Sequence, residues 1–80
     1  MIAKVSVTLK PALLDAQGKT VQHALESLGF KNLKRVRVGK LIEIEVDGSS
    51  PEVARRDAEK MCEKLLANPI IETYSVDIQH

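Results

Sequence analysis

Apolar and polar positions alternate through the first ten residues of the chain. Ala3, Val5, Val7 and Leu9 are apolar, and the residues between them are polar. A period of two with β-branched side chains predicts a strand that has one covered face. Pro11 ends this strand, because proline has no backbone N–H to donate to a sheet.

The pattern then becomes helical. Apolar side chains recur at i, i+3, i+4 and i+7 and form one stripe: Val21, Ala24, Leu25 and Leu28. Asp15 is suited to cap the N-terminus, and Gly29 is suited to the left-handed position that follows a helix. We therefore predict a helix over roughly residues 16–28.

The middle of the chain predicts a β-hairpin with a three-residue loop at residues 39–41. This loop pairs Val38 with Ile42 and Val36 with Ile44 on one face. On the other face it pairs basic with acidic residues, namely Arg37 with Glu43 and Arg35 with Glu45. A two-residue loop would mix the two faces, so the side chains decide the register.

A second helix and a last strand complete the pattern. Ser50 is a suitable N-cap and Pro51 fits the first helical position. The apolar face of this helix holds Ala54, Ala58, Met61, Cys62 and Leu65. Because Asn68 precedes a proline, the helix is expected to stop there. Tyr74, Val76 and Ile78 then alternate with polar residues in a final strand.

The element order β-α-β-β-α-β predicts an α+β fold, the ferredoxin-like sandwich, as one domain over residues 1–80. Right-handed crossovers would give a four-stranded antiparallel sheet in the order 4-1-3-2. Both helices would then cover one face of that sheet.

Composition excludes several classes of function. Twelve basic and eleven acidic residues give a net charge of +1, so no overall field favours nucleic acid or an anionic membrane. Apolar runs are shorter than a membrane span needs, and no secretory leader is apparent. With Cys62 as the only cysteine, no internal disulfide can form, and we expect a cytoplasmic protein.

Candidate chemistry is sparse. Cys62 lies on the apolar face of the second helix, which favours core packing with a raised thiol pKa over catalysis. His23 and His80 have no second ligand at a suitable spacing, so a metal site is not favoured. We therefore expect no catalytic residue, no metal and no cofactor on this chain.

One basic run raises an alternative, an RNA-binding sheet: Lys31, Lys34, Arg35, Arg37 and Lys40. Such sheets stack bases on aromatic side chains of their central strands. The corresponding positions here carry no aromatic residue: Ser6, Thr8, Glu43 and Glu45. Pairing of the arginines with Glu43 and Glu45 is the favoured explanation.

Two segments lack a purely local explanation. Gly18 falls in the first turn of a helix, where glycine costs about 0.5–1 kcal/mol relative to alanine. Apolar residues also continue through the turn around Asn68 and Pro69. A special backbone or a close neighbour would explain each segment, and a close neighbour would mean an interface with another chain.

Three segments carry a family resemblance: VTLKPALLDAQG (7–18), VRVGK (36–40) and MCEKLLANPIIETY (61–74). In this order, over nearly the whole chain, they resemble the PurS family. Its members are the small subunits of bacterial and archaeal phosphoribosylformylglycinamidine synthase. Ala12 and Ala16 stand where the family often has glycine and proline, a mild departure in the loop before the first helix.

The resemblance implies a non-catalytic subunit in the fourth step of purine synthesis. A glutaminase subunit (PurQ) would release ammonia, and a synthetase subunit (PurL) would hold ATP and Mg²⁺. This chain would self-associate as a dimer or tetramer and would bridge the two so that ammonia can pass. The alternative is a free-standing dimeric regulatory module that binds a small metabolite.

We expect interfaces at named positions. Self-association is expected at the sheet edge around Tyr74 or on the charged sheet face. Contacts with the other subunits are expected at the loop before the first helix and at two turns: Lys10, Pro11, Asp15, Gln17, Gly18, Gly39, Lys40, Asn68 and Pro69.

Overall fold

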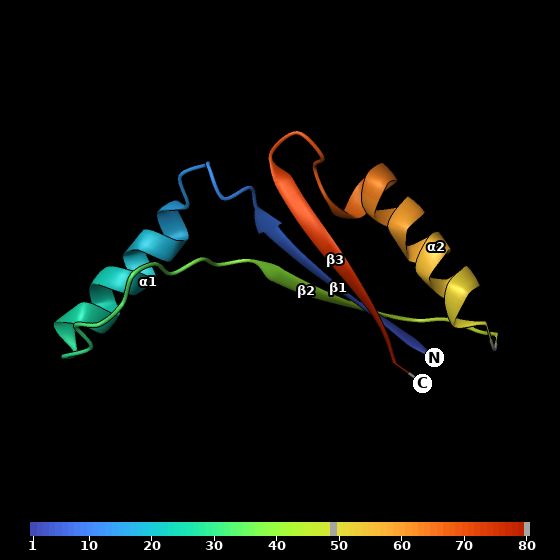
Figure 1. Cartoon of the computed structure of the whole chain (residues 1–80), viewed down its shortest axis with the longest axis horizontal. Coiled ribbons are helices and arrows are strands. Elements are labelled where there is room, and N and C mark those ends of the chain that lie inside the picture. The colour runs from blue at the N-terminus through green and yellow to red at the C-terminus, as the bar shows by residue number, and fades with distance from the viewer. Residues whose placement is uncertain (49, 80) are drawn as a thin grey trace.

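The computed structural model describes residues 1–48 and 50–79, which form two α-helices and three strands (Figure 1). In chain order the elements are β1 (Ile2–Leu9), α1 (Ala16–Ser27), β2 (Lys40–Glu45), α2 (Pro51–Met61), a π-helical turn η1 (Cys62–Leu66) and β3 (Glu72–Gln79). The α+β class is the one that the sequence predicted.

The sheet is antiparallel, in the order β2-β1-β3. Val5 of β1 lies opposite Ile42 of β2 and Val76 of β3, so apolar residues of all three strands share one face. The two neighbours of β1 are those that the sequence predicted. The central position of β1 agrees with its burial, which is the deepest of the three strands.

The core lies between this face and α2. Ala3, Val5 and Val7 of β1 are buried, and Ala54 and Ala58 of α2 are buried as well. Cys62 and Ala67 complete the buried apolar set, and half-buried side chains of β2 and β3 pack around it: Ile42, Ile44, Tyr74 and Val76. The predicted core position of Cys62 is therefore confirmed.

The helix ends follow the local signals. The Asp15 side chain accepts the Gly18 N–H at the start of α1, and the Ser50 hydroxyl accepts the Val53 N–H at the start of α2. Gly29 has φ +108°, the left-handed conformation expected just after a helix. The second helix departs from the prediction in one respect, because it continues after Met61 as a π-helical turn that ends at Leu66.

The predicted strand around residues 35–38 is wrong, so the sheet has three strands and not four. Residues 35–39 are extended but form no strand, and their polar groups bond to the connection between β1 and α1. The Arg35 Nη2 atom lies 2.6 Å from the Pro11 carbonyl oxygen, and the Arg37 guanidinium donates to the Leu9 carbonyl. Glu43 instead faces Lys4 of β1, with 3.9 Å between Nζ and Oε1.

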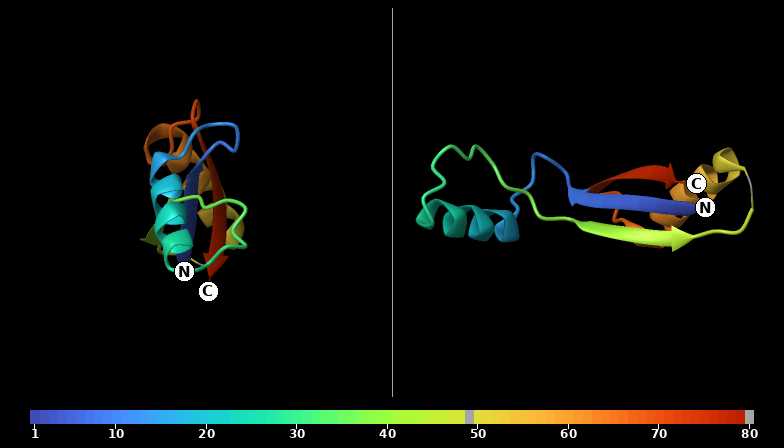
Figure 2. Two further views of the ribbon diagram at one scale, coloured as in Figure 1. Left: turned by 90° about the vertical axis from the view of Figure 1, so that its left-hand side faces the viewer. Right: turned by 90° about the horizontal axis from the view of Figure 1, so that it is seen from below.

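The predicted placement of both helices on one face is also wrong. Figure 2 shows α1 and residues 30–39, the return segment that leads back to β2, extending beyond the end of the sheet, while α2 alone covers it. We call residues 10–39 the arm, and residues 1–9, 40–48 and 50–79 the body. The molecule is consequently elongated, with extents of 47 × 27 × 14 Å. Within the described residues neither helix has the length and apolar character needed to cross a membrane.

Candidate interaction surfaces

The few reactive side chains are not gathered into a site. Across residues 1–48 and 50–79 no three potential metal ligands come together. Burial raises the pKa of the Cys62 thiol, and the carboxylates of Glu59 and Glu63 add to that effect. His23 is exposed on α1, and His80 lies outside the described residues. The residues to consider next are therefore those that could contact another protein.

Asp15 holds the arm in place at its base. Its carboxylate accepts two backbone N–H groups at 2.8 Å, from Gly18 in α1 and from Val38 in the return segment. These hydrogen bonds lower the pKa of Asp15, and the charge of Arg37 lowers it further. A single side chain therefore caps the helix and fixes the returning chain beside it.

Two glycines allow backbones to meet at this point. A Cβ at Gly18 would overlap the Val36 carbonyl oxygen, and a Cβ at Gly39 would overlap the Val7 carbonyl oxygen. The close neighbour expected at Gly18 therefore exists, but it belongs to the same chain and not to an interface. Gly39 is a crossing point of two segments and not part of a hairpin loop.

The turn before β3 is built by local hydrogen bonds and lies beside Lys10. The Asn68 side chain accepts the Ile70 N–H at 3.1 Å, and Glu72 Oε1 accepts the Asn68 N–H at 2.7 Å. The Lys10 N–H donates to the Ile71 carbonyl at 2.8 Å, which joins the turn to the start of the arm. Ile70 in this turn is 77% exposed, and Leu65 in the preceding η1 is 84% exposed.

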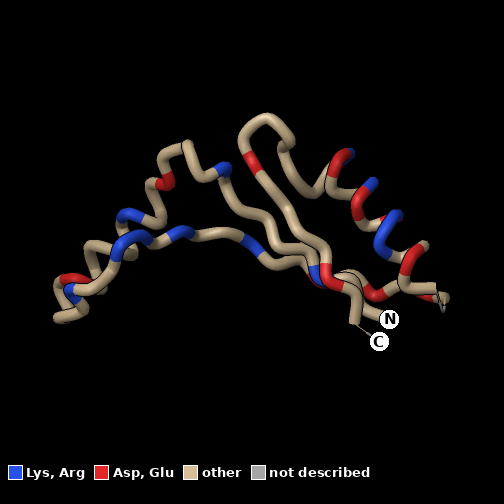
Figure 3. Tube along the Cα trace, in the orientation of Figure 1, with Lys and Arg blue, Asp and Glu red and all other residues tan. Residues whose placement is uncertain are grey.

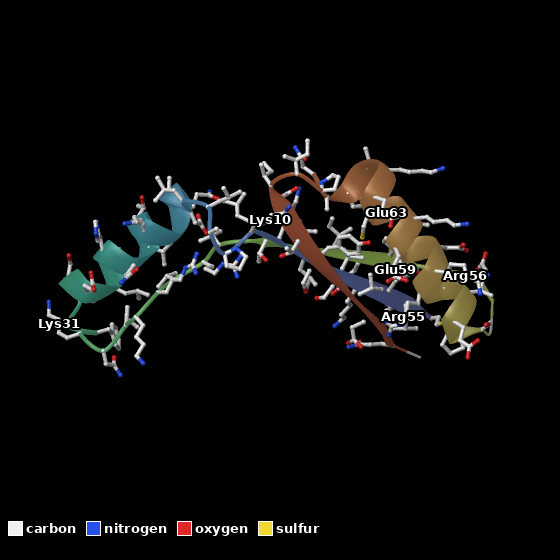
Figure 4. All side chains as sticks on the ribbon, turned by 45° about the horizontal axis from the view of Figure 1, so that its top comes forward. Lys10, Lys31, Arg55, Arg56, Glu59 and Glu63 are labelled. Atoms are coloured by element: carbon white, nitrogen blue, oxygen red, sulfur yellow. The ribbon has the colours of Figure 1, made fainter. Side chains whose placement is uncertain are left out.

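The structure brings several of the predicted interface residues together where arm and body meet, a region we call the junction. A hollow of about 300 Å³ is lined there by both parts of the chain, including Asp15, Gln17, Gly39, Lys40 and Glu72. Figure 4 shows Lys10 in the gap between the arm and the turn before β3. Pro11 is exposed, whereas Gly18 is buried.

Tyr74, the residue predicted for self-association, lies away from the junction. Its side chain is half-buried and packs against the core cluster with Val76. Burial raises the pKa of the Tyr74 hydroxyl. β3 is an edge strand, as predicted, but Tyr74 points from it toward α2 and the core.

The sequence reasoning missed the apolar surface of the arm. The stripe of α1 was expected to cover the sheet, yet Val21 is 40% exposed and Leu28 is 75% exposed. Phe30 follows on the return segment at 55% exposure. The helix was predicted correctly, but the spacing of its apolar residues does not show which surface those residues pack against.

Comparisons with known proteins agree with one another. The family model described as PurS, phosphoribosylformylglycinamidine (FGAM) synthase, matches residues 2–80. The chain is 45% identical over 76 residues to the PurS subunit of Archaeoglobus fulgidus, covering 95% of each protein. The crystal structure of Methanocaldococcus jannaschii PurS superposes with a TM-score of 0.85 at 40% identity, covering 98% of this chain and 94% of that one. A chain of the Thermotoga maritima PurLQS structure matches with a TM-score of 0.81 at 32% identity, covering 96% of both.

Proposed function

This chain belongs to the PurS family, and we propose that it is the small, non-catalytic subunit of a phosphoribosylformylglycinamidine synthase. In that role it would join a glutaminase subunit to an ATP-dependent synthetase subunit during purine biosynthesis. ATP and Mg²⁺ would bind to the synthetase subunit and not to this chain.

The observation that carries this proposal is the likeness to a chain of the Thermotoga maritima PurLQS structure, which extends over nearly the full length of both chains. A bridging subunit needs surfaces that bind its partners, and the conformationally constrained residues of this chain shape one such surface, the junction. Asp15, Gly18 and Gly39 fix the backbone at the junction and do not surround a reacting group.

The junction is the surface we assign to the other subunits. It gathers residues from three separate segments, and it combines basic Lys10 and Lys40 with the exposed apolar side chains of the turn before β3. Apolar anchors within a polar surround are typical of protein–protein interfaces. Backbone groups there are held by hydrogen bonds within the chain, so little ordering would be needed on binding.

Reconstitution tests the function directly. Glutamine-dependent synthase activity is measured with the glutaminase and synthetase subunits of the same organism, with and without this chain. We expect activity and co-elution of the three proteins only when this chain is added. Equal activity without it would contradict the proposal and would favour the alternative of a regulatory module, which the comparisons do not support.

A double variant tests the junction. Lys10→Glu with Gln17→Ala should weaken binding of the other subunits at least tenfold, because it reverses one charge and removes one polar side chain from that surface. The thermal midpoint of the isolated chain should stay within about 2 °C, since surface substitutions change stability little.

The matched control places the same changes away from the junction. Lys60→Glu with Gln79→Ala alters exposed residues of α2 and β3 and should leave binding unchanged. Equal loss of binding in both double variants would indicate a general charge effect. No loss in the junction variant would remove the junction from the proposed contact.

A further inference from the structure

β3 lies at one edge of the sheet, and in the part of the chain that the structure describes no other strand pairs with its outer side. The Lys10 N–H bonds to the Ile71 carbonyl, and hydrogen-bonded pairs alternate along an antiparallel ladder. Thr73, Ser75 and Asp77 therefore direct their N–H and C=O groups toward β1. The residues between them direct these groups outward: Glu72, Tyr74, Val76 and Ile78. Such an outward row is a template on which another chain can add a strand.

Two positions of this outward row are already occupied from within the chain. The Arg55 Nη1 atom of α2 donates to the Val76 carbonyl oxygen at 2.7 Å. At the start of β3, the Glu72 N–H donates to the Asn68 carbonyl oxygen at 2.7 Å. Only Tyr74 lies on the outward row between these two positions. An added strand would therefore have to displace one of these contacts before it could form two neighbouring residue pairs.

The position of Arg55 on α2 brings its side chain to this edge. Ala54 is buried against the sheet, and successive helical residues are about 100° apart. Arg55 therefore flanks the buried side of the helix, whereas Arg56 lies on the opposite side. Figure 4 shows Arg55 on the side of α2 nearer the end of β3 and Arg56 on the outer side.

Arg55 does not spend its charge on a neighbouring carboxylate. Glu59 lies one turn further along α2, at the i+4 spacing that favours an ion pair with an arginine. Across residues 1–48 and 50–79, however, the one ion pair joins Lys4 to Glu43. The guanidinium is therefore directed at the strand edge. Its charge also opposes a second edge of the same kind, because two copies that met there would bring two arginines together.

We infer that Arg55 closes the outer edge of β3 to strand addition. A strand that approached this edge would need the Val76 carbonyl, which the guanidinium holds, and would have to displace a charged side chain. The sheet is thereby kept from growing on this side. This inference argues against the sequence-based expectation of self-association at the edge around Tyr74. It does not rest on the bridging role, so either can fail while the other stands.

Sedimentation velocity of the full chain at high concentration tests the consequence. Arg55→Ala should raise the weight-average mass about twofold or more over that of the unaltered chain, because two freed edges can pair. Arg56→Ala is the matched control, since it removes the same charge from the outer side of α2 and should leave the mass unchanged. An unchanged mass in Arg55→Ala, or an equal rise in both variants, would overturn the proposal.

A second substitution tests whether the larger species form at the β3 edge. Ser75 is exposed, and its side chain lies on the sheet face opposite to Tyr74 and Val76, which pack against the core. Ser75→Lys combined with Arg55→Ala should return the mass to that of the unaltered chain, because paired edges would bring lysines together. A larger mass that persists in the double variant would place the association elsewhere and overturn the proposal. Circular dichroism checks that each variant is folded.

The contact itself is tested by NMR at low concentration, where all variants should have the same mass. The carbonyl carbon resonance of Val76 should move upfield in Arg55→Ala, since the carbonyl loses a charged donor. The same resonance should stay in place in Arg56→Ala. An unchanged Val76 resonance in Arg55→Ala would show that Arg55 does not hold this edge, and the proposal would fall.

Discussion

The arm and the body use their side chains in opposite ways. The body buries Val5, Val7 and Cys62 completely and owes its shape to apolar packing. The arm buries only Gly18 and owes its shape to hydrogen bonds at its base, made by Asp15, Arg35 and Arg37. Burial of apolar side chains in the body stabilises the folded chain as a whole. The few hydrogen bonds at the base of the arm contribute less free energy, and they fix the orientation of the arm relative to the sheet. The two regions should therefore respond differently to substitution.

The largest expected effect is in the body. Val5→Ala removes two methyl groups from a fully buried site and should lower the free energy of unfolding by about 2–3 kcal/mol. Val53→Ala, the matched change at a half-exposed position of α2, should cost no more than about 0.5 kcal/mol. Urea denaturation followed by circular dichroism measures both. Equal losses would mean that the body is not organised around β1.

The next effect is at the base of the arm. Gly18→Ala forces the Val36 carbonyl away from α1 and should cost about 1–3 kcal/mol of local stability. Gly29→Ala, where the space is open and only the positive φ opposes a side chain, should cost about 1 kcal/mol. Hydrogen exchange should show faster exchange across residues 16–38 in Gly18→Ala, with the sheet unchanged. Faster exchange in the sheet as well would show that arm and body are one cooperative unit.

The smallest effect concerns the charge of Asp15. Its folded-state pKa lies below the ordinary value of 3.8, so the stabilisation is present above that value and is lost as pH falls through the lowered pKa. We expect the amide resonances of Gly18 and Val38 to shift together in that acid range, and Asp15→Asn to shift them at neutral pH. Asp57→Asn changes an exposed residue of α2 and should leave the Gly18 and Val38 resonances unshifted. Amides that do not follow Asp15 would indicate that other contacts fix the arm.

The sequence predicted the local features correctly and the partner of one segment wrongly. Caps at Asp15 and Ser50 and the alternation in β1 depend on neighbours within a few residues, so they can be predicted from the sequence alone. Residues 35–38 also alternate, and the prediction paired them with β2. Alternation shows that a segment is extended but not what it pairs with. In the structure this segment bonds to the start of the arm instead: Arg35 donates to the Pro11 carbonyl, and the Val38 N–H donates to the Asp15 carboxylate.

The candidate site divides in the same way. Glycine at position 18 signalled a close neighbour, but the sequence could not show that Val36 of the same chain supplies it. Interface residues were predicted on separate segments, and the fold places four of them, Asp15, Gln17, Gly39 and Lys40, around one hollow; their role in binding stays a prediction. Residues 10–39 contain six basic and two acidic residues, which the sequence alone shows, but only the fold places them on an arm that extends beyond the sheet (Figure 3).

The central position of β1 also affects how the chain is made. Its two partners are remote in sequence, since the pairing nearest along the chain joins Val7 to Lys40, and the pairing with β3 begins only at Glu72. Without a hairpin, the sheet has no local contact from which to start, which slows folding. During synthesis the ribosome would release β1 long before β3 exists, because translation proceeds from the N-terminus. The nascent chain would therefore lack one neighbour of β1, the most buried strand of the folded sheet, until β3 is made.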